Sequence, residues 1–342
     1  MARSNTNALA AVAVSGAAFA QVTITGSVAY GYQTTKTNVT PVVGIYIDSA
    51  GNGQAGAPAA GTTGNTILRE NVTGGNGVKA SGFGVDTASI TIAASEDLGG
   101  GLKVSGSMAL GGITRGDTPS GEDFKMVVSG GFGSILLGQI EIGSGIRGLG
   151  TAGAPVNNME GEVLGAASSG TDIVKYTAPK MGAFTVSGSL TEAKGLATGL
   201  SAGQSSAVTV GVAYAANGLA ASLDTTDWDK DSTGSDSRYR LSAKYDMGAV
   251  AIGAGYEDIK MMTSGVKTKY TVMGVSAPMG ALTVGFATAK KEVTGAANVT
   301  GNTIGLKYAL SKRTSVTANT ASWKTAGAAS ETKTSLLLNH NF

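Results

Sequence analysis

The sequence predicts an all-β protein, a closed antiparallel β-barrel of sixteen strands that spans a membrane. Three observations predict it: apolar and polar side chains alternate along many short segments, turn signals recur in two length classes, and no stretch approaches the roughly 20 apolar residues of a membrane helix. The chain has 342 residues, of which 53 are Gly, 42% are hydrophobic and 14% are charged. This composition suits a sheet with lipid on one side and water on the other.

Alternation is clearest in one segment, residues 22–32. Val22 and Ile24 share one face there, and Thr23 and Ser27 lie on the other, because successive side chains of a strand point to opposite faces. We expect the apolar face to meet lipid and the polar face to line a lumen. The same split recurs in three further segments, at residues 89–92, 102–110 and 184–190. A soluble β-sandwich would give the same alternation. The lengths of the connections are therefore needed to distinguish a sandwich from a membrane barrel.

Turn signals separate these segments and fall into two classes. Seven are short, near residues 95–100, 130–133, 178–182, 216–218, 246–248, 277–280 and 310–313. Eight are longer and polar, near residues 34–84, 114–122, 143–170, 195–205, 229–236, 261–266, 293–300 and 326–330. Fifteen connections make sixteen strands, and short turns at one rim with long loops at the other are typical of membrane barrels.

The first twenty residues have the layout of a secretory signal. Arg3 precedes the apolar run 8–14, and Ala-Phe-Ala at 18–20 offers a small-x-small cleavage site. We therefore expect residues 1–20 to be a removed signal peptide and residues 21–342 to form one barrel domain, with a buried amphipathic helix as the alternative for the first segment. Because the chain has no cysteine, a secreted fold of this size must close its own hydrogen bonds without disulfides.

Four internal segments carry a family resemblance. They are SEDLGGGLKVSGSMA at 95–109, FGSILLGQ at 132–139, IVKYTAP at 173–179 and TIGLKYALSKRT at 303–314. These segments resemble the trimeric porins of Gram-negative bacteria, in the branch common among β-proteobacteria. The resemblance implies an outer-membrane channel that assembles as a homotrimer and whose third loop, residues 143–170, folds inward to narrow the barrel. An ordinary surface loop is the alternative for that segment.

The terminal strand is similar to the family's last strand. It places His340 and the final residue, Phe342, on one face, and the resemblance implies that this end is the assembly signal recognised by the barrel-assembly machinery. The sequence also departs from the family. Gln139 stands where the family usually has Arg, and Lys125 where it often has Arg. The resemblance therefore does not fix the charge selectivity of the lumen.

The candidate lining residues follow from the expected lumen face and from the resemblance. The constriction-loop candidates are Glu141, Arg147, Glu160 and Glu162. The pore-wall candidates are Lys103, Lys125, Gln139, Lys175, Arg238, Arg240, Lys244 and Lys307. Basic residues outnumber the lumen-facing acids Glu141, Asp224, Asp246 and Glu257, which predicts a weak preference for anions. Carboxylates on the loop that face a basic wall would create a transverse field for dipolar solutes.

The sequence gives little support for a catalytic, metal-binding or nucleic-acid-binding site. With one histidine and no cysteine, nucleophilic and His-based metal sites have almost nothing to be built from, and a net charge of +2 does not imply nucleic-acid binding. The G-x-G-x-x-G pattern at 143–148 precedes no helical periodicity, so we interpret it as chance. The acidic stretch 227–234 matches a calcium loop poorly. We interpret it as a solvated loop, with a weak divalent-cation site that bridges lipopolysaccharide as the alternative.

We therefore expect a protein of the bacterial outer membrane, in contact with its lipid and lipopolysaccharide, whose water-filled lumen passes small hydrophilic solutes and ions. We expect no enzyme activity, cofactor or bound metal. A rival hypothesis is a barrel plugged by the long first loop that serves as a structural or adhesive surface protein, and single-channel conductance would separate the two. A barrel enzyme acting at the outer rim is a third, disfavoured by the lack of a usable histidine.

Overall fold

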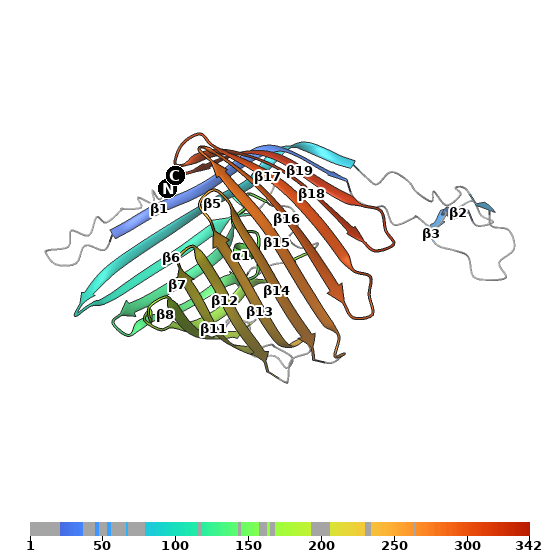
Figure 1. The fold of residues 1–342 in the computed structure, drawn as a ribbon. Coiled ribbons are helices and arrows are strands. Elements are labelled where there is room, and N and C mark those ends of the chain that lie inside the picture. Colours follow the sequence, from blue (N-terminus) through green and yellow to red (C-terminus); the bar gives the residue numbers. More distant parts are fainter. Residues whose placement is uncertain are drawn as a thin grey trace, which may run out of the picture.

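The computed structural model describes residues 21–36, 45–47, 53–55, 66–67, 79–114, 118–142, 145–156, 163–164, 168–192, 206–229, 234–262 and 264–342. Sixteen strands form one closed antiparallel barrel, in which β1 pairs with both β5 and β19 (Figure 1). The barrel strands are β1 (Gln21–Lys36), β5 (Lys79–Gly99), β6 (Leu102–Gly111), β7 (Ser120–Gly130), β8 (Gly133–Ile142), β9 (Ser168–Thr177), β10 (Phe184–Glu192), β11 (Ser206–Ala216), β12 (Leu219–Trp228), β13 (Ser235–Asp246), β14 (Ala251–Met261), β15 (Lys267–Met279), β16 (Leu282–Val293), β17 (Val299–Ala309), β18 (Thr314–Thr325) and β19 (Glu331–Asn341). The predicted fold class and strand number are confirmed.

The connections follow the predicted alternation of short turns and long loops. The seven connections predicted to be short join the strand pairs that begin with β5, β7, β9, β11, β13, β15 and β17, and the eight predicted to be long join the remaining neighbours. The two classes overlap in length, because the β9–β10 connection, residues 178–183, is longer than the β14–β15 connection, residues 262–266. The β11–β12 turn is Asn217-Gly218, with φ of 51° and 78°. These two residue types tolerate positive φ, which the common two-residue hairpin turn requires. The local turn chemistry therefore agrees with the barrel topology.

Two kinds of short element were not predicted. Inside the first long connection, β2 (Ile45–Ile47), β3 (Gly53–Ala55) and β4 (Thr66–Ile67) form a three-stranded sheet in the order β3–β2–β4. In the third, α1 (Arg147–Gly150) is a single helical turn, whereas we expected no helix after the G-x-G-x-x-G pattern. One turn is too short to carry a 3.6-residue hydrophobic period. In the described part of the chain, no helix is long and apolar enough to cross a membrane.

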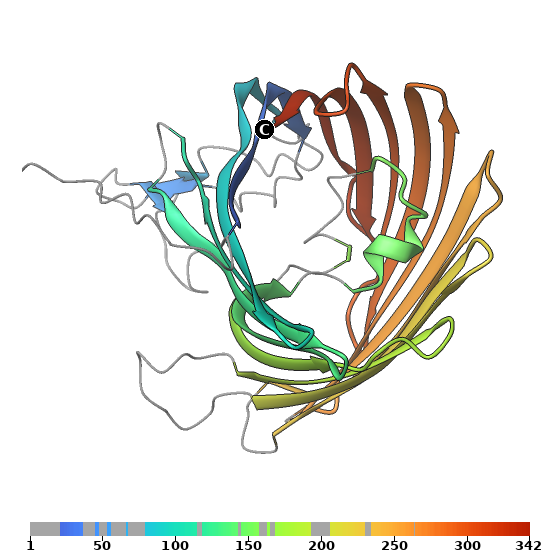
Figure 2. The ribbon, with the colours of Figure 1, turned by 90° about the vertical axis from the view of Figure 1, so that its left-hand side faces the viewer.

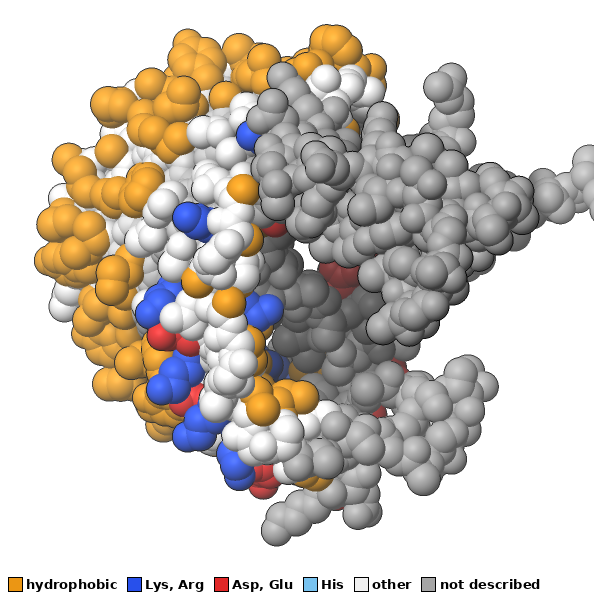
Figure 3. Space-filling view, turned by 90° about the vertical axis from the view of Figure 1, so that its right-hand side faces the viewer, with side chains coloured by type: hydrophobic (Ala, Val, Ile, Leu, Met, Phe, Trp, Pro, Cys, Tyr) orange, Lys and Arg blue, Asp and Glu red, His pale blue; other side chains and the backbone are white. Residues whose placement is uncertain are grey.

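The outward face of the barrel carries an apolar belt. Residues directly opposite one another on paired strands share a face, so Ile24, Ile92, Met108 and Phe124 form one outward row across four strands. Each of these side chains is exposed, Ile24 to 62%. In Figure 3, hydrophobic side chains gather over the outer surface and charged ones lie along the rim. An apolar surface of this extent is typical of a barrel that faces lipid.

The inward face is polar or small. The row next to the one just described contains Thr23, Ala93, Ser107 and Lys125. Figure 2 looks into the ring of strands and shows α1 on the inner side, beside the strands of the C-terminal half. The barrel therefore has an apolar outside, a polar inside and a segment of chain within its lumen.

Candidate functional site

The connection between β8 and β9 packs against the inward face of the C-terminal strands. Its described parts are residues 145–156, which include α1, and residues 163–164; we call them the loop segment. Contacts of α1 are with β13, β14 and β15, and residues further along reach β16 and β17, where Ala154 lies against Gly285 and the Pro155 carbonyl against Gly305. We call the inward face of β13–β18 the covered wall.

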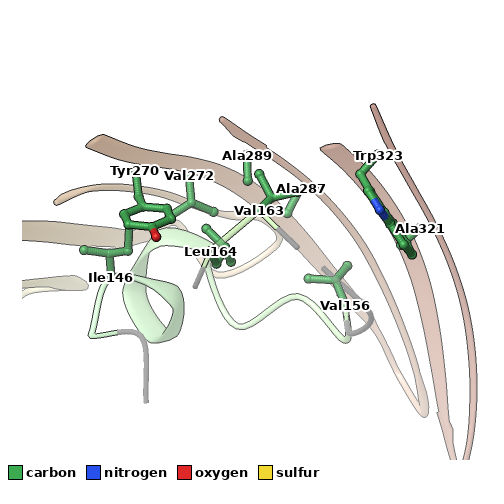
Figure 4. Close-up of a cluster of buried hydrophobic side chains, with 10 residues drawn as sticks. All are labelled: Ile146, Val156, Val163, Leu164, Tyr270, Val272, Ala287, Ala289, Ala321 and Trp323. Atoms are coloured by element: carbon green, nitrogen blue, oxygen red, sulfur yellow. The ribbon is translucent and has the colours of Figure 1, made fainter. Parts of the chain in front are cut away.

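An apolar cluster holds the loop segment on this wall. Ile146 and Val163 have no exposed surface, and Val156 and Leu164 are 4% exposed. They pack with six wall residues (Figure 4): Tyr270 and Val272 from β15, Ala287 and Ala289 from β16, and Ala321 and Trp323 from β18. Full burial of an aliphatic side chain of this size contributes roughly 1.5–3 kcal/mol. The cluster therefore stabilises one docked position of the loop segment.

Hydrogen bonds reinforce the docking. The Ser276 hydroxyl donates to the carbonyl oxygen of Ala152 over 2.8 Å, which ties β15 to the loop segment. Arg147, a predicted constriction residue, donates from Nη2 to the carbonyl oxygen of Val156 over 3.0 Å. Its partial burial lowers the pKa of the guanidinium below the ordinary value, but a guanidinium remains protonated at any physiological pH. Arg147 therefore braces the loop segment internally.

A row of charged side chains crosses the covered wall on β12, β13 and β14. Arg240 lies 2.9 Å from Asp224, measured from Nε to Oδ1, and 4.0 Å from the Oε2 atom of Glu257. The three side chains are only 13%, 18% and 8% exposed, respectively, and the Arg240 guanidinium packs against Gly145 of the loop segment. Arg240 is therefore balanced by two carboxylates and is partly covered.

Arg238 occupies a comparable position one row nearer the long-loop rim. Its guanidinium carbon lies 5.3 Å from the centre of the Trp228 ring, and its Nη2 donates to Thr226 Oγ1 over 3.0 Å. A guanidinium over an aromatic face is stabilised by the ring quadrupole. Lys244, also inward, lies 3.9 Å from Asp246. The basic residues predicted on β13 thus have partners from the barrel itself.

The inward face of β1 and β5–β9 has a different character, and we call it the open wall. A hollow of about 310 Å³ on it is lined mainly by small side chains, among them Thr23, Ser105 and Ser107. Lys125 also lines it, with its side chain 40% exposed and its Nζ 2.6 Å from Asp123 Oδ2. Water and solute can reach these groups.

Three more predicted wall residues lie on inward positions. Lys103 stands opposite Asp97 and Ser129. Lys175 and Lys307 have uncharged cross-strand neighbours: Leu136 and Ser189 for Lys175, and Thr283 and Thr317 for Lys307. Lys307 also lines a hollow of about 250 Å³ together with Ser27, Thr317 and Asn339. Among their described cross-strand neighbours these two lysines have no carboxylate, unlike Lys103, which faces Asp97.

Gln139 was predicted on the pore wall, and the structure shows that this was wrong. Its strand register pairs it with Phe124, an outward residue that is 47% exposed. On the other side it faces Asp172, to which its Nε2 donates over 3.4 Å. Gln139 shares the parity of outward Ile135, so the alternation in β8 contained this information. Gln139 was assigned to the lumen because the family resemblance has Arg at this position.

Of the three acidic residues predicted on the constriction loop, the structure describes one, Glu141. Glu141 belongs to β8 rather than to the loop, and its backbone N–H donates to Asp123 Oδ1 over 2.8 Å. Glu160 and Glu162 lie outside the described residues, as does the middle of the acidic stretch, 230–233. Across the described part of the chain, no three His, Cys, Asp or Glu side chains are grouped so that they could hold a metal ion.

Sequence reasoning missed Asp123 and Trp228, which partner predicted wall residues. Asp123 had a readable signal, because it lies two positions before Lys125 and so on the same face of the strand. Trp228 meets Arg238 across β12 and β13, a contact that needs the strand register. At the chain end, the Nδ1 of His340 lies 2.9 Å from Thr314 Oγ1, and Phe342 exchanges two backbone hydrogen bonds with Gly26 across the seam.

Comparisons with known proteins agree with this architecture. A family model described as Gram-negative porin matches residues 8–327, whereas no curated protein sequence gives a match. Among solved structures, an anion-selective porin from Comamonas acidovorans has 20% identity and a TM-score of 0.67, covering 95% of this chain and 100% of its own. OmpT of Vibrio cholerae, in a trimer form, has 12% identity and a TM-score of 0.65, covering 94% and 99%.

A mutant porin of Rh. blastica is also similar in fold, with 12% identity, a TM-score of 0.61 and coverage of 94% of this chain and 100% of its own. At these identities the solved structures establish the fold alone, and the family match carries the assignment. The match spans nearly the whole chain, and the barrel has the apolar outside and polar inside of an outer-membrane channel. This protein belongs to the Gram-negative porin family and is an outer-membrane channel for passive diffusion.

Proposed function

We propose that small hydrophilic solutes pass between the loop segment and the open wall. The observation that carries this proposal is the docking of residues 145–156 on β13–β17, since Ile146 is fully buried there and the loop occupies lumen space. Solutes would then meet Ser105, Ser107 and Lys125 rather than the covered wall. In this view the loop segment is the constriction and the protein acts as a sieve, with no catalytic role.

The direct test is a planar-bilayer recording of the purified protein, alongside a variant that lacks residues 146–156. Wild type should give discrete conductance steps, and the deletion should give larger ones. Equal steps from a folded deletion variant would move the constriction elsewhere, with the first loop as the next candidate. A wild type without steps would favour the rival hypothesis of a plugged barrel.

We further propose a weak preference for anions. Lys175 and Lys307 face uncharged cross-strand neighbours, whereas the charges of Arg240 and Lys125 are balanced by nearby carboxylates. Inward carboxylates such as Asp86, which accepts a hydrogen bond from Gln33 over 2.6 Å, oppose the preference and keep it weak. The arginines Arg238 and Arg240 thus lose the leading role that the sequence suggested.

Reversal potentials in a salt gradient test the preference. The double variant Lys175→Gln/Lys307→Gln should shift the permeability ratio toward cations. The matched control is Lys269→Gln, because Lys269 pairs in register with Asp258 and Glu292 on the outward face. If the double variant and this control gave the same reversal potential as wild type, the assignment to these lysines would be wrong.

The remaining proposals concern assembly and partners. We propose a homotrimer, supported by the trimer form of the similar OmpT, and native mass spectrometry should then show three subunits. We propose that the apolar belt meets lipid and lipopolysaccharide, and that the assembly machinery recognises the end of the chain, with His340 and Phe342. Removal of residues 1–20 as a signal peptide predicts Gln21 as the first residue in an intact-mass measurement.

A further inference from the structure

Five inward glycines lie directly beneath the loop segment. They are Gly253 and Gly255 on β14, Gly274 on β15, Gly285 on β16 and Gly305 on β17, and we call them the glycine seat. They are neighbours across the sheet, because Gly253 pairs with Gly274 and Gly285 pairs with Gly305. Between β15 and β16 the two pairs are offset by one inward position, since Gly274 faces Ala287 and Gly285 faces Ser276. The seat therefore runs as a stepped row of small residues across four strands of the covered wall.

The backbone of the loop segment fills the space that side chains would take at these positions. A Cβ atom at Gly274 would stand 2.5 Å from the Cα of Thr151, and one at Gly255 would stand 2.8 Å from Ile146. At Gly253 and Gly305 a Cβ would collide with the carbonyl oxygens of Leu149 and Pro155, respectively. These neighbours are backbone atoms, so they cannot yield by rotating a side chain.

The glycine seat is not simply a sign of a glycine-rich chain. Gly82 and Gly84 occupy inward positions on β5, and a Cβ at either would have nothing within 4 Å. On the opposite side of the same sheet, large apolar residues flank the seat glycines along each strand, for example Met273 and Val275 around Gly274. Since glycine weakens a strand, five aligned glycines beneath one segment indicate a requirement for close approach.

We propose that the glycine seat sets the width of the channel, because it lets the loop segment lie flat against the wall. This inference rests on the proposed function, in which the loop segment is the constriction. A methyl group at a seat position lifts the loop segment toward the lumen axis. The apolar cluster around Ile146 and Val163 keeps the loop segment from detaching, so the channel becomes narrower rather than wider.

The experiment compares Gly274→Ala and Gly305→Ala with the matched control Gly84→Ala. Heat-modifiable migration first shows that each variant is folded. Single-channel conductance, and the largest neutral polyethylene glycol that still enters the channel, are then measured. Both seat variants should have lower conductance and a smaller size cut-off, whereas Gly84→Ala should match wild type.

Each outcome bears on one proposal. Seat variants that conduct like wild type would overturn the inference while leaving the channel function intact. A higher conductance would also overturn it, because it would mean that the methyl group releases the loop segment instead of lifting it. A wild type without conductance would instead refute the proposed function. Because conductance is recorded from single folded channels, a loss of stability alone would not lower it.

Discussion

The covered wall and the open wall differ in the residues that occupy their inward strand positions. On β14–β17, small residues such as Gly274, Ala287 and Ser276 occupy the inward positions that lie directly beneath the loop backbone, because the backbone must fit against them. On β5–β7 they include Ser107 and Lys125, which line an open hollow. The comparison indicates that small inward residues mark where the chain folds back against the wall, and under our proposal the polar ones line the path of the solute.

Charge follows the same division. Arg240 on the covered wall is 13% exposed and has two carboxylate neighbours, whereas Lys125 on the open wall is 40% exposed and has one. A buried pair is strongly destabilised when one partner is removed, whereas an exposed pair contributes little to stability. Substitution of charges that the loop segment covers, such as Arg240, should therefore act mainly on stability. Substitution of charges on the open wall, or of the exposed Lys307, should act mainly on ion selectivity.

The largest effect is expected for Arg240→Gln. The substitution leaves Asp224 and Glu257 without their cation in a poorly exposed site, and breaking such a pair costs on the order of 3 kcal/mol. The temperature at which the folded barrel loses its heat-modifiable migration should fall clearly. The control is Lys244→Gln, since Lys244 is 30% exposed and 3.9 Å from its partner Asp246. Equal shifts for the two variants would contradict the division between buried and exposed pairs.

An effect of similar size, but confined to the loop segment, is expected for Ile146→Ala, which empties part of the apolar cluster that holds this segment. Truncation of a fully buried isoleucine costs about 2–5 kcal/mol, and Ile146 has no exposed surface. Because the barrel strands remain paired, the cost should appear as loop opening, seen as a noisier single-channel current. Ile135→Ala is the control, since Ile135 faces outward and is 37% exposed. A quiet current from the Ile146 variant would show that other contacts hold the loop.

The architecture was predictable from the sequence because it depends on local signals. Alternation of apolar and polar residues and turn pairs such as Asn217-Gly218 are visible within a few residues, and both led to sixteen strands. The third connection was recognised from its length and from the family resemblance. Its helix α1 was missed, since four residues carry no period.

Most of the site depends on the register between neighbouring strands. That Arg240 meets both Asp224 and Glu257 follows only once β12, β13 and β14 are aligned. The glycine seat has a weak sequence signal: within a strand, a glycine stands between two large apolar residues, as in Met273-Gly274-Val275. The same pattern recurs in β16 and β17. Without the register this pattern cannot be distinguished from the general abundance of glycine. Gln139 shows a different error, in which the family resemblance was given more weight than the alternation along β8.

The smallest effect on stability, but a clear one on selectivity, is expected for Lys125→Gln. Lys125 and Asp123 are both partly exposed, 2.6 Å apart, and an exposed pair contributes at most about 1 kcal/mol. The substitution nevertheless leaves an unbalanced carboxylate on the open wall. Charge in a narrow lumen acts through a dielectric lower than that of bulk water, so the permeability ratio should shift toward cations.

Salt concentration separates this local electrostatic effect from a change of channel shape. Exposed charges are screened beyond about 8 Å at physiological ionic strength and beyond about 3 Å at 1 M. The reversal-potential shift of Lys125→Gln should therefore shrink as salt is raised, while its conductance relative to wild type stays constant. The isosteric partner change Asp123→Asn should shift the ratio the opposite way, because it leaves Lys125 unbalanced. If both variants shifted the ratio in the same direction, the open wall would not be where ions are selected.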